Sequence, residues 1–129
     1  MPSAPLRPVT TWPAIVGRVL AELRKESGLN QGDVADAVGV GQAAWSKIER
    51  GDSALTIEQL YAAARRLELD ASDVLRYAEL VRREAEVQGV EVELARHKPR
   101  DALAAGLVLV AGATLGVLVV EAILKSRRR

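Results

Sequence analysis

The chain has 129 residues, a formal net charge of +1 and no cysteine. This length gives room for one domain of ordinary size, and the near-neutral charge excludes a histone-like polycation that binds nucleic acid by charge alone. The lack of cysteine excludes disulfide scaffolds, thiolate nucleophiles and cysteine-ligated zinc.

The first residues are rich in proline. Residues 1–13, MPSAPLRPVTTWP, hold four of the five prolines and have no apolar stretch long enough for a signal peptide. We expect a disordered arm that ends where a helix begins at Pro13, since proline fits the first turn of a helix.

The next residues predict three helices separated by glycines. In Ala14–Ser27 the apolar residues recur at the spacing of one helix face, and a glycine follows. Asn30 and Asp33 form a variant of the capping box at the start of a second, short helix. A third helix, QAAWSKIERG, follows almost at once, with Trp45 and Ile48 facing one way. Two short helices joined by a tight glycine-containing turn indicate a helix-turn-helix.

Two further helices complete the predicted domain. Thr56 and Gln59 form a second capping box ahead of a stripe of leucine and alanine. Another helix opens near Asp70, and no sustained alternation typical of strands appears before Gly89. The expected fold class is therefore all-α, with a five-helix domain in residues 14–76.

Residues 77–101 are expected to form a linking helix and a basic juxtamembrane segment. Within them, VEVEL alternates apolar and acidic residues, a pattern that fits a short strand or a continued helix. We favour a helix to about Arg96, because a lone strand would have no partner in this chain.

The residues that follow predict a single transmembrane helix. The chain is uncharged from Ala102 to Val120 and almost wholly apolar to Leu124. A helix over 102–124 would reach roughly 30 Å, the thickness of a hydrocarbon core. The basic tail, residues 125–129, would anchor at the headgroups.

Small residues on this expected span predict close helix packing. Ala105, Gly112 and Gly116 fall on one face, and GATLG is a GxxxG pattern. Such a face lets two membrane helices approach closely. It therefore favours a homodimer.

The segment LRKESGLNQGDVADAVGVGQAAWSKIERG resembles the lambda repressor/Cro-like (XRE-type) helix-turn-helix family. The resemblance runs from about Val16 to Leu75, and it is most specific in GLNQ, VGV and SKIERG. It implies a five-helix lambda-repressor-like domain that binds double-stranded DNA. The recognition helix, residues 42–50, would lie in the major groove, and the protein would act as a dimer.

The resemblance also implies the DNA-binding residues. Asn30 and Gln31 match positions that touch phosphate and fix the docking register. Arg50 matches a backbone contact beside the recognition helix. Five residues match the outward face of that helix, where bases are read: Gln42, Ala43, Ala44, Ser46 and Lys47.

A second class of function stays open at this point. Residues 14–89 hold more acidic than basic side chains, and Ala43 and Ala44 stand where many relatives have longer polar residues. A RodZ-like membrane scaffold has a similar layout, and its helix-turn-helix domain binds a cytoplasmic protein partner such as a cytoskeletal filament. An exposed positive patch formed by Gln42, Lys47 and Arg50 would favour DNA.

The sequence therefore predicts a membrane-anchored, sequence-specific transcriptional regulator of bacterial or phage type. We expect a single-pass protein of the bacterial inner membrane with its helix-turn-helix domain in the cytoplasm, because a DNA reader must face that side. An enzyme is not expected: the carboxylate pairs lie at helix starts, and no glycine-rich phosphate loop or metal-binding spacing is present. His97, the one histidine, lies between two basic residues, so we expect neither a cofactor nor a metal.

Overall fold

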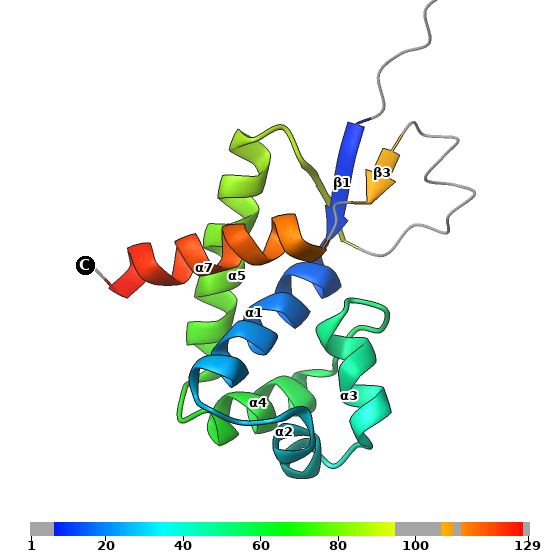
Figure 1. Cartoon of the computed structure of the whole chain (residues 1–129), viewed down its shortest axis with the longest axis vertical. Coiled ribbons are helices and arrows are strands. Elements are labelled where there is room, and N and C mark those ends of the chain that lie inside the picture. Colours follow the sequence, from blue (N-terminus) through cyan, green and yellow to red (C-terminus); the bar gives the residue numbers. More distant parts are fainter. Residues whose placement is uncertain (1–6, 95–106, 110–111, 128–129) are drawn as a thin grey trace, which may run out of the picture.

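The computed structural model describes residues 7–94, 107–109 and 112–127 (Figure 1). In these residues the chain forms six helices and three short strands. In chain order they are β1 (Arg7–Thr11), α1 (Trp12–Glu26), α2 (Gln31–Val38), α3 (Gln42–Glu49), α4 (Ile57–Arg66), α5 (Ala71–Val87), β2 (Glu91–Glu93), β3 (Leu107–Leu109) and α7 (Gly112–Arg127).

The expected helices α1 to α5 are present, although α5 continues to Val87, beyond the predicted domain end at residue 76. The capping boxes of α2 and α4 are those that the sequence predicts. The Asn30 side chain accepts a hydrogen bond of 2.8 Å from the Asp33 backbone N–H, and the Asp33 carboxylate accepts one of 3.0 Å from the Asn30 N–H. Thr56 and Gln59 form the same reciprocal pair at α4. These bonds satisfy backbone donors that the first turn of a helix cannot pair internally.

One hydrophobic core lies around α1. Ile15 and Leu20 of α1 and Trp45 of α3 are completely buried, and side chains of α2, α4 and α5 join the same cluster. Burying a side chain of this size contributes about 1.5–3 kcal/mol. Gly39, in the left-handed conformation at φ 84°, makes the turn that brings α3 back beside α2.

The strands correct two predictions, while the domain itself is helical, as the sequence predicts. Residues 7–11 form β1 and not a disordered arm, and residues 91–93 form β2 in place of a helix continuing to Arg96. Both strands are parallel to each other, and β3 joins β1 on its other side, giving the order β2-β1-β3. Val9 of β1 aligns with Glu91 and with Leu109. The proline-rich N-terminal residues therefore supply, in β1, the partner strand for β2 in the VEVEL segment, residues 90–94.

The expected continuous helix over 102–124 is also corrected. Leu107–Leu109 is a strand, and α7 begins only at Gly112 and continues to Arg127. Among the described residues we find no helix with the length and apolar character needed to cross a bilayer. Leu107–Leu109 pairs with β1, whereas the sequence predicted that these residues would lie in a membrane helix.

Helix α7 packs on the helix-turn-helix domain itself (Figure 1). Leu118, Val119, Ala122 and Ile123 are buried in the common core. Gly116 faces Arg18 of α1, since a Cβ at Gly116 would lie 2.7 Å from an Arg18 guanidinium nitrogen. This glycine therefore permits close packing within one chain. Gly112 is the first residue of α7, and Ala105 lies outside the described residues.

Gly17 sets how closely α1 approaches α3. A Cβ at this position would collide with the carbonyl oxygen of Ile48 and would lie 2.9 Å from that of Glu49. Both obstacles are backbone atoms, which cannot swing aside as a flexible side chain can. Gly17 thus holds the recognition helix against α1.

We expect Gly17→Ala to lower the free energy of unfolding by about 2–3 kcal/mol, because the two helices must separate to admit a methyl group. Urea unfolding followed by circular dichroism measures this. Gly41→Ala is the matched control, since no atom lies within 4 Å of a Cβ built there. Equal stability of the two variants would contradict the close approach.

Candidate nucleic-acid interface

Helix α3 separates its buried and exposed residues as the sequence predicts. Trp45 and Ile48 are buried, whereas the predicted base-reading residues lie outward. Gln42, Ala43, Ala44 and Lys47 are exposed, and Ser46 is half-buried. Gly41 is the N-cap residue of α3 and makes no side-chain hydrogen bond to the helix. The backbone N–H groups in the first turn of α3 therefore lack the serine or threonine oxygen that often caps a helix.

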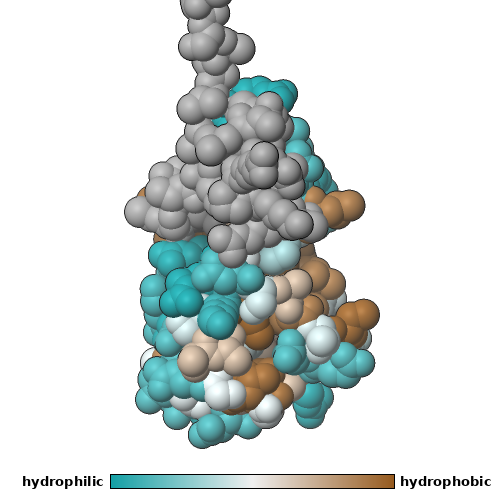
Figure 2. Space-filling view, turned by 90° about the vertical axis from the view of Figure 1, so that its right-hand side faces the viewer, coloured by the Kyte–Doolittle hydropathy of each residue, from teal (hydrophilic) through white to brown (hydrophobic). Residues whose placement is uncertain are grey.

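The fold brings most of the predicted DNA-binding residues into one place. A shallow hollow of about 420 Å³ is lined by Gln31 of α2 together with Gln42, Ala43, Ser46, Lys47 and Arg50. Ala44 is exposed on the same helix, and Asn30 is exposed at the start of α2. Figure 2 views the molecule from the side on which α3 lies in Figure 1, and it shows polar and apolar residues interleaved there.

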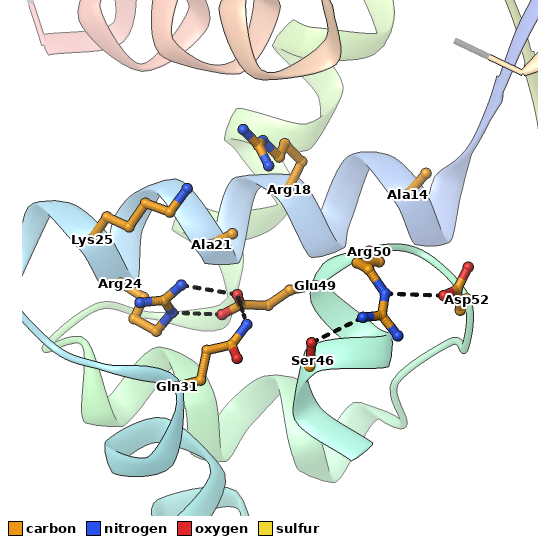
Figure 3. A pocket seen from close by; sticks show the side chains of 10 residues that line it. All are labelled: Ala14, Arg18, Ala21, Arg24, Lys25, Gln31, Ser46, Glu49, Arg50 and Asp52. Atoms are coloured by element: carbon orange, nitrogen blue, oxygen red, sulfur yellow. Dashed lines mark hydrogen bonds and ion pairs between the residues drawn. The ribbon is translucent and has the colours of Figure 1, made fainter. Parts of the chain in front are cut away.

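A buried ion pair, missed by the sequence analysis, holds α3 in position. The Arg24 guanidinium of α1 donates to both carboxylate oxygens of Glu49, at 2.7 and 3.0 Å (Figure 3). Both residues are less than a tenth exposed. A third nitrogen of Arg24 donates to the Leu29 carbonyl at 2.9 Å, which ties in the turn before α2.

Two more donors complete the environment of Glu49. The Trp45 indole N–H donates to Oε2 at 2.7 Å, and the Gln31 amide donates to Oε1 at 2.9 Å. Each oxygen therefore accepts two hydrogen bonds, as a buried carboxylate requires. The Gln31 amide joins the start of α2 to α3. Gln31 therefore has a positioning role, which the sequence analysis, expecting only a phosphate contact, did not predict.

The surroundings of Glu49 lower its pKa. Burial by itself would raise the pKa of this carboxyl, since it disfavours the charged form. Hydrogen bonds from Arg24, Gln31 and Trp45 and the positive charge of Arg24 outweigh burial, and the pKa of Glu49 lies below its ordinary value. The carboxylate is thus ionised whenever the domain is folded near neutral pH.

Arg50 remains exposed but has a partner. Its guanidinium donates to the Asp52 carboxylate at 3.1 Å and to the Ser46 hydroxyl oxygen at 3.3 Å (Figure 3). The Arg50 side chain is still 60% exposed, so it can exchange this partner for a phosphate. Lys47 is exposed one turn away, which places two cations at the rim of the hollow.

A second hollow adjoins the first between α1 and α3. It measures about 540 Å³ and shares Gln31, Ser46 and Arg50 with the first (Figure 3). Lys25 of α1 lies on its wall. The charged surface available to a ligand therefore extends from α3 onto α1. In the described part of the chain, no cluster of three metal-ligating side chains is present.

The family model for the helix-turn-helix domain matches residues 15–97. The chain belongs to this helix-turn-helix family. The match covers all of α1 to α5 except the first three residues of α1, and it includes every residue that lines the hollow on α3. The resemblance to XRE-type proteins is thereby confirmed for the domain. Among curated proteins, none matches the chain.

Solved structures of a gene regulator and of a restriction-modification controller protein share this fold. The clp gene regulator ClgR from Corynebacterium glutamicum superposes with a TM-score of 0.58 at 25% identity, over 60% of this chain and 82% of ClgR. A second structure of that regulator gives 0.51 at 26% identity, over 53% and 88%. A point mutant of the restriction-modification controller protein C.Esp1396I gives 0.51 at 25% identity, over 60% and 95%.

The buried pair predicts a strong energetic coupling between Arg24 and Glu49. Arg24→Met leaves a buried carboxylate without its counter-ion and should lower the free energy of unfolding by about 3–5 kcal/mol. The double variant with Glu49→Met removes both charges and should recover much of that loss. Urea unfolding of both singles and the double gives the coupling energy, and additive effects would contradict the pair.

Acid should weaken the same interaction. Because the pKa of Glu49 is lower in the folded than in the unfolded state, its contribution is complete above the ordinary glutamate pKa of about 4.3 and is lost as the pH falls through the lowered value. We expect the stability difference between the wild type and the Arg24→Met, Glu49→Met double variant to shrink below that pH. A difference that stays constant down to pH 2 would contradict this assignment.

Proposed function

We propose that the protein is a sequence-specific DNA-binding transcriptional regulator that inserts α3 into the major groove. The observation that carries this is the hollow on α3, where Gln42, Lys47 and Arg50 lie together and accessible on a helix fixed from behind by Glu49. The relatives support it, since ClgR is a gene regulator and C.Esp1396I a controller protein.

The side chains suggest the role of each position. Gln42 has the amide that pairs with adenine in bidentate fashion, and Lys47 reaches guanine or a phosphate. The methyl groups of Ala43 and Ala44 can contact thymine methyls. Asn30, at the positive end of α2, and Arg50 are suited to phosphate contacts.

We propose that two copies act together, because paired half-sites about one helical turn apart multiply specificity. We also propose attachment to the bacterial inner membrane, with the helix-turn-helix domain in the cytoplasm. The exposed apolar residues Val117, Val120 and Leu124 of α7 support attachment. A catalytic role is not proposed, because the hollow offers amides and cations and no activated nucleophile.

A protein partner in place of DNA is the second candidate. It is favoured by the Arg50–Asp52 ion pair, which reduces the positive field at the hollow, and by the exposed Ala43 and Ala44. A RodZ-like scaffold function would use this same face. The two candidates differ in their dependence on salt, since phosphate binding releases counterions and weakens steeply as salt rises.

Selection of the full chain against random duplex DNA at several salt concentrations distinguishes them. We expect enrichment of a two-fold symmetric sequence and an affinity that falls linearly with salt on logarithmic axes. No enrichment together with salt-independent behaviour would overturn the DNA function and leave the protein partner.

Two substitutions should separate specificity from general affinity. Gln42→Ala should reduce discrimination at one base pair by about 1–3 kcal/mol while leaving nonspecific binding intact. Lys47→Ala should lower the salt slope by up to about 0.9, since one cation is lost. Fluorescence anisotropy on the selected duplex measures both.

Arg83→Ala serves as the control for these variants. Arg83 is an exposed cation of α5 that lines neither of the two hollows at α3. If this variant changed binding as much as Lys47→Ala, the effect would come from net charge and not from contacts made by α3.

A further inference from the structure

Helix α7 is apolar on two opposite sides. One side supplies Leu118, Val119, Ala122 and Ile123 to the core. The other carries an exposed stripe at helical spacing, with exposed fractions of 59% at Val117, 42% at Val120 and 48% at Leu124. A helix that packs on its own domain normally presents polar residues outward, so this stripe marks a surface that another partner covers.

The stripe lies away from the proposed DNA-binding face. Helix α1 runs between α7 and α3, and α7 contacts α1 and α5 (Figure 1, Figure 3). A partner held by the outer side of α7 would therefore leave α3 accessible. A large flat partner is geometrically compatible with simultaneous DNA binding.

Charge at the end of the helix indicates which partner fits. The Lys125 side chain is 68% exposed, and Arg127, Arg128 and Arg129 follow it in the sequence. An apolar stripe that leads into a basic cluster suits an anionic bilayer, where valine and leucine enter the acyl boundary and the cations lie among phosphates.

We propose that the outer face of α7, formed by Val117, Val120 and Leu124, lies in the plane of an anionic membrane while α7 stays docked on α1 and α5. This rests on the proposed membrane attachment and specifies its geometry. The helix extends from Gly112 to Arg127, about 24 Å at 1.5 Å per residue and short of the roughly 30 Å of a hydrocarbon core. Leaving the domain would also uncover its buried apolar side.

A native ion pair reports whether α7 is docked. Lys125 Nζ lies 3.8 Å from a Glu84 carboxylate oxygen of α5, so a zero-length carbodiimide should join the two residues only in the docked state. Lys25 and Glu22 lie at the same 3.8 Å within α1 and give a reference link whose two partners belong to one helix. Mass spectrometry of the full chain, free and on vesicles, quantifies both links.

The experiment first tests attachment by flotation with vesicles containing phosphatidylglycerol. Flotation with an unchanged link between Lys125 and Glu84 is the expected result. Flotation with loss of that link, while the link between Lys25 and Glu22 persists, would overturn the in-plane geometry and keep membrane attachment. Failure to float would overturn attachment itself, and no link in free protein would overturn docking.

Substitutions test the surface directly. Val117→Ser, Val120→Ser and Leu124→Ser together should reduce vesicle affinity at least tenfold without loss of folding, because all three side chains are already exposed. Ile57→Ser, at a 71% exposed apolar residue of α4, is the matched control and should have little effect.

Lipid charge and self-association complete the test. Replacing phosphatidylglycerol by phosphatidylcholine should weaken binding by roughly fivefold for each cation engaged.

If the triple variant instead turned a dimer into a monomer and bound vesicles as the wild type does, a second copy would cover the stripe and the proposal would be overturned. Vesicle-bound wild type should still bind the selected duplex.

Discussion

The geometry of the candidate interface depends on one buried carboxylate. Glu49 receives donors from α1, from the start of α2 and from its own helix, so the relative placement of three helices is fixed at a single point. A charge buried this deeply is costly unless every lone pair is used. Because every lone pair of Glu49 must accept a hydrogen bond, the geometry of the pair with Arg24 is specific. The exposed residues of α3 are positioned by the same geometry.

The close approach at Gly17 and the hydrogen bonds of Glu49 act together. Because Gly17 has no side chain, α3 lies directly against α1. This shortens the distance that the Arg24 side chain must cover to contact Glu49. What remains on the outer surface is a short helix with small side chains around Gln42 and Lys47. In the proposed function such a surface would read shape and methyl groups as much as charge, which fits a domain with more acidic than basic residues.

Local patterns predicted local structure well. Capping boxes, glycine stops and helical spacing identified α1 to α5, and the buried side of α3 followed from Trp45 and Ile48. Contacts between distant residues could not be predicted, because neither the Arg24–Glu49 pair nor the pairing of Val9 with Glu91 produces a periodic pattern in the sequence. The apolar run after residue 101 was ambiguous for a physical reason: lipid and a protein core both accept such residues.

The central place of β1 in the sheet bears on the order in which the molecule assembles. Its partners β2 and β3 come from residues 91–93 and 107–109, so β1 can pair on both sides only after residue 109 has left the ribosome. The contacts among α1 to α5 are closer in sequence and can form earlier. The helix-turn-helix unit can therefore form before the sheet is completed and before α7 docks on it.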